Sequence, residues 1–163
     1  MDKLENLILE ALAEDSRLTP ERLALMTGAK AADIAKKVKT LEDRGVIVKY
    51  NTVINDEKLD KESVEALIEV RVSPEHNRGF DAIAEEILQF PEVRGLYLMS
   101  GGYDLAVTVE GRTLKEVAMF VSEKLSTLGK VLSTATHFIL KKYMVSGALM
   151  DSPDEKKRLA VHV

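Results

Sequence analysis

The chain has 163 residues, of which 45% are hydrophobic and 31% are charged, so it is long enough for one ample domain or two small ones. It has no cysteine, which excludes disulfides and thiolate sites. Its three histidines are scattered and do not have the spacing of metal ligands, so we expect no metal or other cofactor, and catalysis is disfavoured. No apolar run approaches the roughly 20 residues of a membrane span, and the first residues carry no signal-peptide pattern, so we expect a cytoplasmic protein.

The formal net charge of -4 is unevenly distributed along the chain. Residues 22–50 contain seven basic and three acidic side chains, whereas residues 1–21 and 51–163 each carry a net charge of -4. A basic segment inside an acidic protein favours a confined nucleic-acid surface. Nucleic-acid binding is therefore expected in this segment and not over the whole molecule.

Three short helices are predicted in the first 45 residues. The helical spacing of apolar residues over positions 4–12 predicts the first. Thr19-Pro20-Glu21 supplies an N-cap, a first-turn proline and an acid at the positive end of a second helix, which Gly28 ends. A third is predicted over residues 31–44, with Gly45 as its C-cap. Three helices with a glycine turn between the last two predict a helix-turn-helix.

The third helix of a helix-turn-helix enters the major groove of double-stranded DNA, and here its start and outward side carry four lysines. Lysines bind phosphates, and no Arg, Asn or Gln stands among them to read bases, so sequence discrimination is expected to be loose. The alternative is a lysine-rich face that is merely solvated. The candidate DNA-binding residues are Thr19, Lys30, Ala31, Asp33, Lys36, Lys37, Lys39 and Thr40.

The rest of the chain predicts a second domain, and the protein is expected to be α+β. Residues 46–54 are rich in β-branched side chains and predict a strand that leads into a polar linker. The order strand, helix, strand, strand, helix, strand then predicts a ferredoxin-like βαββαβ sheet with both helices on one face. The predicted organisation is a helix-turn-helix domain at 1–50, a strand and linker at 51–62, the ferredoxin-like domain at 63–145 and a polar tail at 146–163.

Apolar residues are predicted on both faces of this sheet. Two helices cover one face only, so an apolar second face predicts that the sheets of two copies pack together as a homodimer. The residues assigned to the uncovered face, opposite Tyr97, Val107 and Ile139, are Leu96, Leu98, Ala106, Leu132, Phe138 and Leu140.

The stretch from Met99 to Val107 is predicted to be two strands joined by a tight Gly-Gly turn. Gly101 and Gly102 permit positive φ and leave backbone N–H groups uncovered, and Asp104 adds a carboxylate. Donors beside a carboxylate suit the two charges of an amino acid, so this turn is the candidate effector site. The alternative is that the stretch is only a turn.

The two-domain pattern resembles the Lrp/AsnC family of leucine-responsive and asparagine-responsive regulators, over nearly the whole chain. The resemblance rests on Leu23-Ala24, Gly28, Lys37-Val38, Leu41-Glu42, Gly45-Val46-Ile47, Gly102-Tyr103-Asp104 and Ser133-Thr134-Ala135-Thr136. It implies a homodimeric or octameric transcriptional regulator, not an enzyme, that binds an amino acid or related metabolite at a contact between dimers near the hairpin. The effector-binding residues expected on this resemblance are Ser100, Gly101, Gly102, Tyr103, Asp104, Thr134 and Thr136.

Two positions depart from the family pattern, and two other functions stay open. Lys30 stands where a serine cap is usual, which forfeits roughly 1 kcal/mol of capping, and Lys37 replaces an arginine fork with a point charge. Siroheme decarboxylases resemble the same arrangement and would use a histidine such as His137. An architectural DNA-binding protein would need no effector at all.

Overall fold

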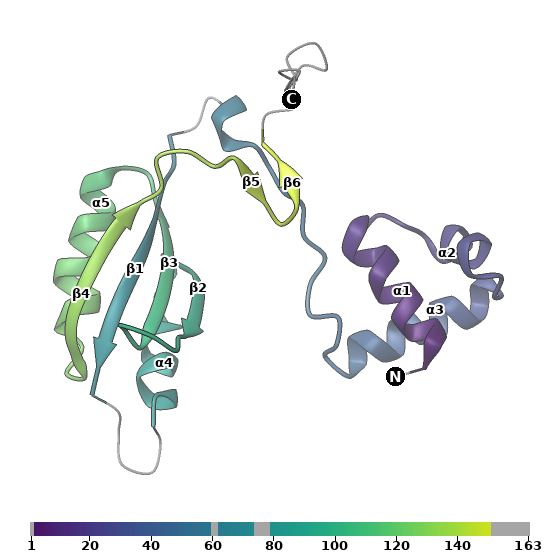
Figure 1. The fold of residues 1–163 in the computed structure, drawn as a ribbon, viewed down its shortest axis with the longest axis horizontal. Coiled ribbons are helices and arrows are strands. Elements are labelled where there is room, and N and C mark those ends of the chain that lie inside the picture. Colours follow the sequence, from purple (N-terminus) through teal and green to yellow (C-terminus); the bar gives the residue numbers. More distant parts are fainter. Residues whose placement is uncertain (1, 60–61, 74–78, 151–163) are drawn as a thin grey trace, which may run out of the picture. The chain divides into compact units, whose positions relative to one another are not determined.

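A computed structural model describes residues 2–59, 62–73 and 79–150 and divides into two compact units, Met1–Val53 and Ile54–Val163 (Figure 1). The first unit consists of the helices α1 (Lys3–Glu14), α2 (Pro20–Thr27) and α3 (Ala31–Asp43). Their apolar faces meet in a core whose fully buried members are Ile8, Leu23, Ile34 and Leu41. The three predicted helices are therefore confirmed.

The ends of these helices follow the local chemistry of the sequence. Asp2 and Glu5 form a capping box at the start of α1, in which each carboxylate accepts the other residue's backbone N–H at 2.8 Å. Thr19 caps α2 by accepting the N–H of Arg22 at 3.4 Å. Gly28 ends α2 with φ of 72°, a left-handed conformation that glycine adopts without strain. Lys30 begins α3 without a side-chain cap, as its departure from serine predicts.

The strand predicted over residues 46–54 is wrong. Its β-branched residues favour extended backbone, but a strand needs a hydrogen-bonded neighbour, and no described residue of this chain pairs with it. Val48 is 87% exposed and Ile54 57% exposed as a result. The linker is therefore an extended segment followed by a short 3-10 helix, η1 (Asp56–Lys58).

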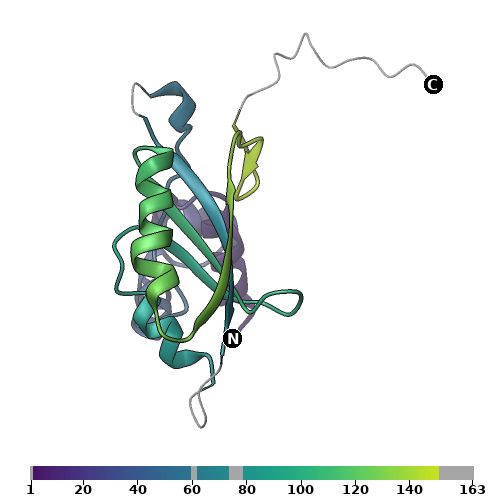
Figure 2. The same cartoon turned by 90° about the vertical axis from the view of Figure 1, so that its left-hand side faces the viewer.

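The second unit is the ferredoxin-like domain that the element order predicts. Its antiparallel sheet has the order β2-β3-β1-β4, formed by β1 (Val64–Val72), β2 (Val93–Leu98), β3 (Leu105–Gly111) and β4 (Val131–Phe138). The connecting helices are α4 (Asp81–Ile87) and α5 (Leu114–Met119), and α5 continues as a π-helical turn, η2 (Phe120–Lys124), and a 3-10 turn, η3 (Leu125–Thr127). Figure 2 shows α5 against one face of the sheet.

The expectation for the uncovered face of the sheet needs correction. Leu96 pairs with Val107, Leu98 with Leu105, and Phe138 with Ala66, so all three belong to the helix-covered face, where Leu96 and Phe138 pack against the buried core. Cross-strand register decides the face, and directly paired residues share one. The open face carries instead a mixed set of side chains, namely Leu67, Glu69, Arg71, Tyr97, Ala106, Thr108, Ser133, Ala135 and His137.

The predicted last strand and polar tail also differ from the structure. β4 ends at Phe138, and a small hairpin of β5 (Met144–Val145) and β6 (Ala148–Leu149) follows the segment after it. Met150, which the prediction placed in the tail, is only 8% exposed, and its N–H donates to the carbonyl of Tyr143 at 3.0 Å. Residues 146–150 therefore belong to the folded unit, and residues 151–163 of the predicted tail lie outside the described residues.

Candidate functional site

The outward side of α3 carries exposed lysines, as its spacing predicts. Ile34 and Leu41 face the core, which turns Lys36 and Lys39 toward solvent, and Lys30 is exposed at the helix start. Lys39 contacts Asp43 one turn later at 3.2 Å, but both side chains stay more than 60% exposed, at 73% and 64%. Such a pair is weak in water, so Lys39 can exchange its carboxylate for a phosphate.

Lys37 has a different place from the other three lysines. Its ammonium binds the Asp2 carboxylate and lies 4.0 Å from Glu5, and its side chain is only 29% exposed. The hydrogen bond that the Lys37 ammonium donates to Asp2 is the main reason that the pKa of Lys37 is raised above its ordinary value. Arg44 adds a contact of 3.8 Å to Glu5. Lys37 therefore joins α3 to the start of α1, a long-range contact that spacing along one helix could not reveal.

The other candidates on the first unit lie in three places. Asp33 and Thr40 line a shallow hollow of about 430 Å³ together with Lys36, where α3 passes the start of α1. Thr19 lies at the start of α2, and Ala31 is half-buried at the start of α3.

Sequence reasoning missed three residues on this surface. Arg22 is exposed in the first turn of α2, beside the cap that Thr19 forms. Ala32 and Ala35 are exposed on α3, where their small side chains allow close approach to a groove and contact with thymine methyl groups. The signal was available, because Arg22 belongs to the basic segment and both alanines lie between Lys30 and Lys36 in the predicted third helix.

The predicted tight turn is a six-residue loop from Met99 to Asp104, between the end of β2 and the start of β3. Its base is closed by hydrogen bonds from Met99 N–H to the Asp104 carbonyl at 2.8 Å and from Asp104 N–H to the Val70 carbonyl at 3.1 Å. Figure 2 shows the teal-green loop projecting from the sheet on the side away from α5.

The two glycines of the loop do not adopt the positive φ that glycine permits. A Cβ at Gly101 or Gly102 would also meet nothing within 4 Å. Neither backbone conformation nor packing among the described residues explains why these positions lack side chains. The space they leave is open to a molecule outside this chain.

One oxygen of the Asp104 carboxylate stabilises the fold by accepting a backbone hydrogen bond. Oδ2 accepts the backbone N–H of Val72 at 2.9 Å and so joins the loop to the end of β1. Oδ1 has no hydrogen-bond partner among residues 2–59, 62–73 and 79–150. The side chain is half-buried, so a carboxylate oxygen remains at the loop for a donor from outside the chain.

Thr134 and Thr136 do not lie with the loop. They pair with Val70 and Ile68 across β1, which places their side chains on the helix-covered face, and Thr134 Oγ1 lies 3.3 Å from the Ser126 hydroxyl.

His137 is on the open face, where its Nε2 is 3.3 Å from a Glu69 carboxylate oxygen. The described residues contain no group of three His, Cys, Asp or Glu side chains that could hold a metal ion.

Comparison with known proteins identifies both units. Residues 1–48 match the winged helix-turn-helix DNA-binding model, and residues 65–149 match the Lrp/AsnC ligand-binding domain. The chain belongs to the Lrp/AsnC family. It is therefore a DNA-binding transcriptional regulator, and the enzyme alternative fails because its Lrp/AsnC relatives are named regulators.

Two curated relatives and one solved structure cover nearly the same length. The HTH-type regulator YugG of Bacillus subtilis (strain 168), itself uncharacterized, is 46% identical and aligns over 96% of this chain and 95% of its own. LrpA of Pyrococcus horikoshii is 31% identical and aligns over 87% of this chain and 98% of its own. A Neisseria meningitidis regulator solved with L-Met has a TM-score of 0.72 at 22% identity, over 96% and 98% of the two chains. The last likeness shows the shared fold alone.

No helix in the described part of this Lrp/AsnC protein is long and apolar enough to cross a membrane.

Proposed function

We propose that the second unit senses an amino acid or a related small metabolite at the Ser100–Asp104 loop. The observation that carries the proposal is the Asp104 carboxylate, which holds β1 with one oxygen and leaves the other without a partner among the described residues. The ammonium of an amino acid would bind this oxygen, and its carboxylate would take the backbone N–H groups beside Gly101 and Gly102. Ser100 and Tyr103 complete the proposed site.

Two further observations support an amino acid as the effector. The space where Gly101 and Gly102 lack a Cβ is open, so a ligand can approach the backbone closely. A solved structure of the same fold, from Neisseria meningitidis, is a complex with L-Met. Thr134 and Thr136 would join this site only if a second copy brought them to it.

We propose further that the protein binds DNA as a homodimer or a higher oligomer such as an octamer. The open sheet face supports self-association, because Tyr97 is 58% exposed there. DNA contact is proposed through Lys30, Lys36 and Lys39, with Thr19 and Arg22 at the phosphate backbone. A role in transcription supports a cytoplasmic location for this activity.

A thermal-shift panel of amino acids tests the sensing proposal. A ligand that binds only the folded protein raises the melting temperature by mass action. We expect at least one amino acid to do so for the wild type and not for Asp104→Asn, which keeps an acceptor for Val72 but loses the charge. An equal shift in both proteins would remove Asp104 from the site. A panel with no shift at all would favour the effector-free architectural protein.

A further inference from the structure

The linker between the two units is tied to the protein at both of its ends. On the side of α3, Val46 and Ile47 donate their N–H groups to the Leu41 carbonyl at 2.9 and 3.2 Å. Further along, the Tyr50 hydroxyl donates to a Glu42 carboxylate oxygen at 2.8 Å. Burial, followed by this bond to Glu42, raises the pKa of the Tyr50 phenol. The chain thus remains attached to the first unit as far as Tyr50.

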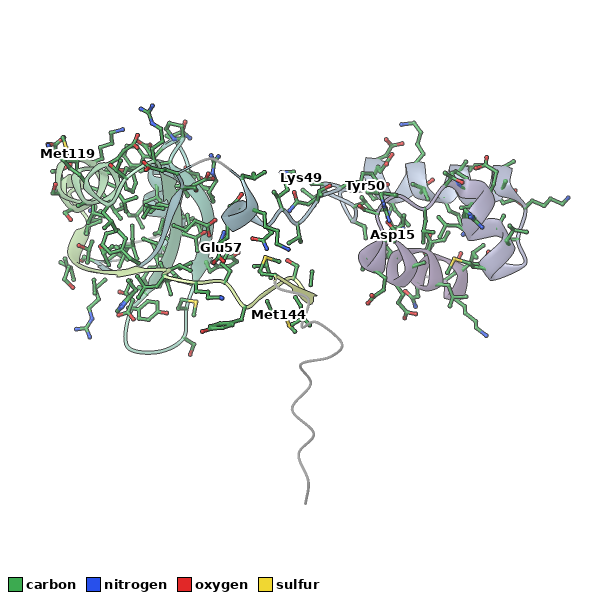
Figure 3. All side chains as sticks on the ribbon, turned by 90° about the horizontal axis from the view of Figure 1, so that it is seen from above. Asp15, Lys49, Tyr50, Glu57, Met119 and Met144 are labelled. Carbon is green, nitrogen blue, oxygen red and sulfur yellow. The ribbon has the colours of Figure 1, made fainter. Side chains whose placement is uncertain are left out.

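On the other side, residues that follow β4 hold the linker. Asn55 donates from its side-chain amide to the Met150 carbonyl at 2.7 Å, and Met150 is itself buried. Lys142 binds Asp56 at 3.4 Å and also contacts Glu65 at the start of β1. Figure 1 shows η1 beside the β5–β6 hairpin that ends at Met150, and Figure 3 labels Glu57 and Met144 there.

The Lys142 ion pairs are partly shielded from water. The Lys142 side chain is 27% exposed, and those of Asp56 and Glu65 are 40% and 32% exposed. Burial opposes the charge on the Lys142 ammonium, but the two carboxylates outweigh it, so its pKa is raised. Two anchors from residues 139–150 therefore hold η1, the Asn55 bond and the Asp56 pair, and the Glu65 pair joins Lys142 to β1.

We propose that residues 139–150 are a clamp on the linker, and that residues 51–54, between the two ties, form its flexible joint. With both ties in place, the five Cα–Cα steps from Tyr50 to Asn55 span at most about 18 Å. Without them, the seventeen steps from Ile47 to Val64 could span roughly 60 Å. The two ties together therefore shorten the reach of the linker about threefold.

The clamp also gives the second unit a means to control the linker. Residues 139–150 continue directly from β4, and Ile139 N–H donates to the Glu65 carbonyl at 2.9 Å, so the sheet and the clamp are one connected piece. A change at the sheet that displaced β4 would displace Lys142, and with it Asp56 and the start of the joint at residues 51–54. Hinges of this kind absorb φ/ψ change in a few residues between rigid parts.

Hydrogen exchange on the full chain, without DNA or ligand, tests the proposal independently of the sensing function. We expect the amides of residues 51–54 to exchange at nearly unprotected rates, and those of Ile47, Lys58 and Leu59 to exchange more slowly. If the amides of residues 51–54 are as protected as those of Ile47, Lys58 and Leu59, the proposal is wrong.

Variants that remove one tie at a time should change hydrogen exchange only at the end of the linker that this tie holds. Lys142→Met should accelerate exchange at Lys58 and Leu59 about fivefold and leave Val46 and Ile47 unchanged. Tyr50→Phe should do the reverse. Asn55→Ala removes the other anchor without touching β1 and should also accelerate amide exchange at Lys58 and Leu59. It replaces Lys142→Met if that variant is too unstable to measure. Lys115→Met, at an exposed lysine outside the clamp, is the matched control. Unchanged exchange at Lys58 and Leu59 in both clamp variants would contradict the proposal.

Discussion

The α3 surface and the Ser100–Asp104 loop are built in different ways. On α3, Lys36 and Lys39 are presented by a helix whose inner face is fixed by Ile34 and Leu41, so one chain contains the whole surface. At the loop, a carboxylate oxygen lacks a partner among the described residues, and two glycines face open space. The DNA-binding surface is thus complete in one chain, whereas the proposed sensing site is completed by something outside it.

Lysine removal tests the complete surface and should have the largest effect. Lys36→Ala with Lys39→Ala should weaken DNA binding at least tenfold to a hundredfold on every sequence and lower the log-log salt dependence by about two units for each subunit that contacts the DNA. Fluorescence anisotropy over a salt series measures both. Lys115→Met is the control on the other unit. A loss confined to one DNA sequence would contradict phosphate binding by these lysines.

Two substitutions of Asp104 test whether the loop is structural, sensing or both. Asp104→Ala removes the acceptor for Val72 N–H and should lower the free energy of unfolding of the second unit by about 2 kcal/mol. Asp104→Asn keeps an acceptor oxygen and should cost less than half of this. Chemical denaturation followed by circular dichroism compares them. Equal stability of Asp104→Ala and wild type would show that the Val72 bond contributes nothing.

The elements were more predictable than the contacts between them. The cap at Thr19, the turn at Gly28 and the exposed side of α3 follow from local chemistry, so the sequence alone predicts them. The face on which Leu96 lies depends on its pairing with Val107, which follows an irregular register between Val93 and Gly95. Periodicity within one strand carries no such information.

The site residues divide in the same way. Exposure of the α3 lysines was predictable because a helix repeats every 3.6 residues. The partner of Lys37 lies 35 positions away at Asp2, and the partner of Asp104 is a backbone N–H on β1. Both contacts bring together distant parts of the chain, and spacing in the sequence does not encode them.

Acid should weaken the contact between α1 and α3. Lys37, and next the backbone N–H of Glu5, hold the pKa of Asp2 below its ordinary value. A carboxylate whose pKa is lowered by folding stabilises the folded state at any pH above the ordinary carboxyl pKa of about 4. This stabilisation is lost as the pH falls through the lower pKa of the folded state.

Circular dichroism between pH 6 and pH 2 measures this loss of helix stability. Asp2→Asn should be less stable than wild type at pH 6 and should show less change on acidification. The effect should be smaller than that of Asp104→Ala, because the Asp2 and Lys37 side chains are 53% and 29% exposed. Glu10→Gln, at an exposed acid of α1, is the control. Identical acid profiles for Asp2→Asn and wild type would be evidence against the contact.

Gly101→Ala should have the smallest effect on the chain alone. A Cβ there meets nothing within 4 Å, so the free energy of unfolding should change by no more than about 0.5 kcal/mol. The same methyl group would block a ligand that approaches the backbone, so binding of the best thermal-shift amino acid should be lost. Calorimetric titration measures the binding. A variant that binds as well as wild type would place the ligand elsewhere.

The most direct test of the account is whether an amino acid changes DNA affinity through the loop. Fluorescence anisotropy would follow a duplex that the protein selects from a random pool, with each amino acid added in turn. The account predicts that at least one amino acid changes the Kd for DNA about fivefold or more in the wild type, and that Asp104→Asn binds the duplex equally well but does not respond. No response to any amino acid, or an unchanged response in Asp104→Asn, would contradict it.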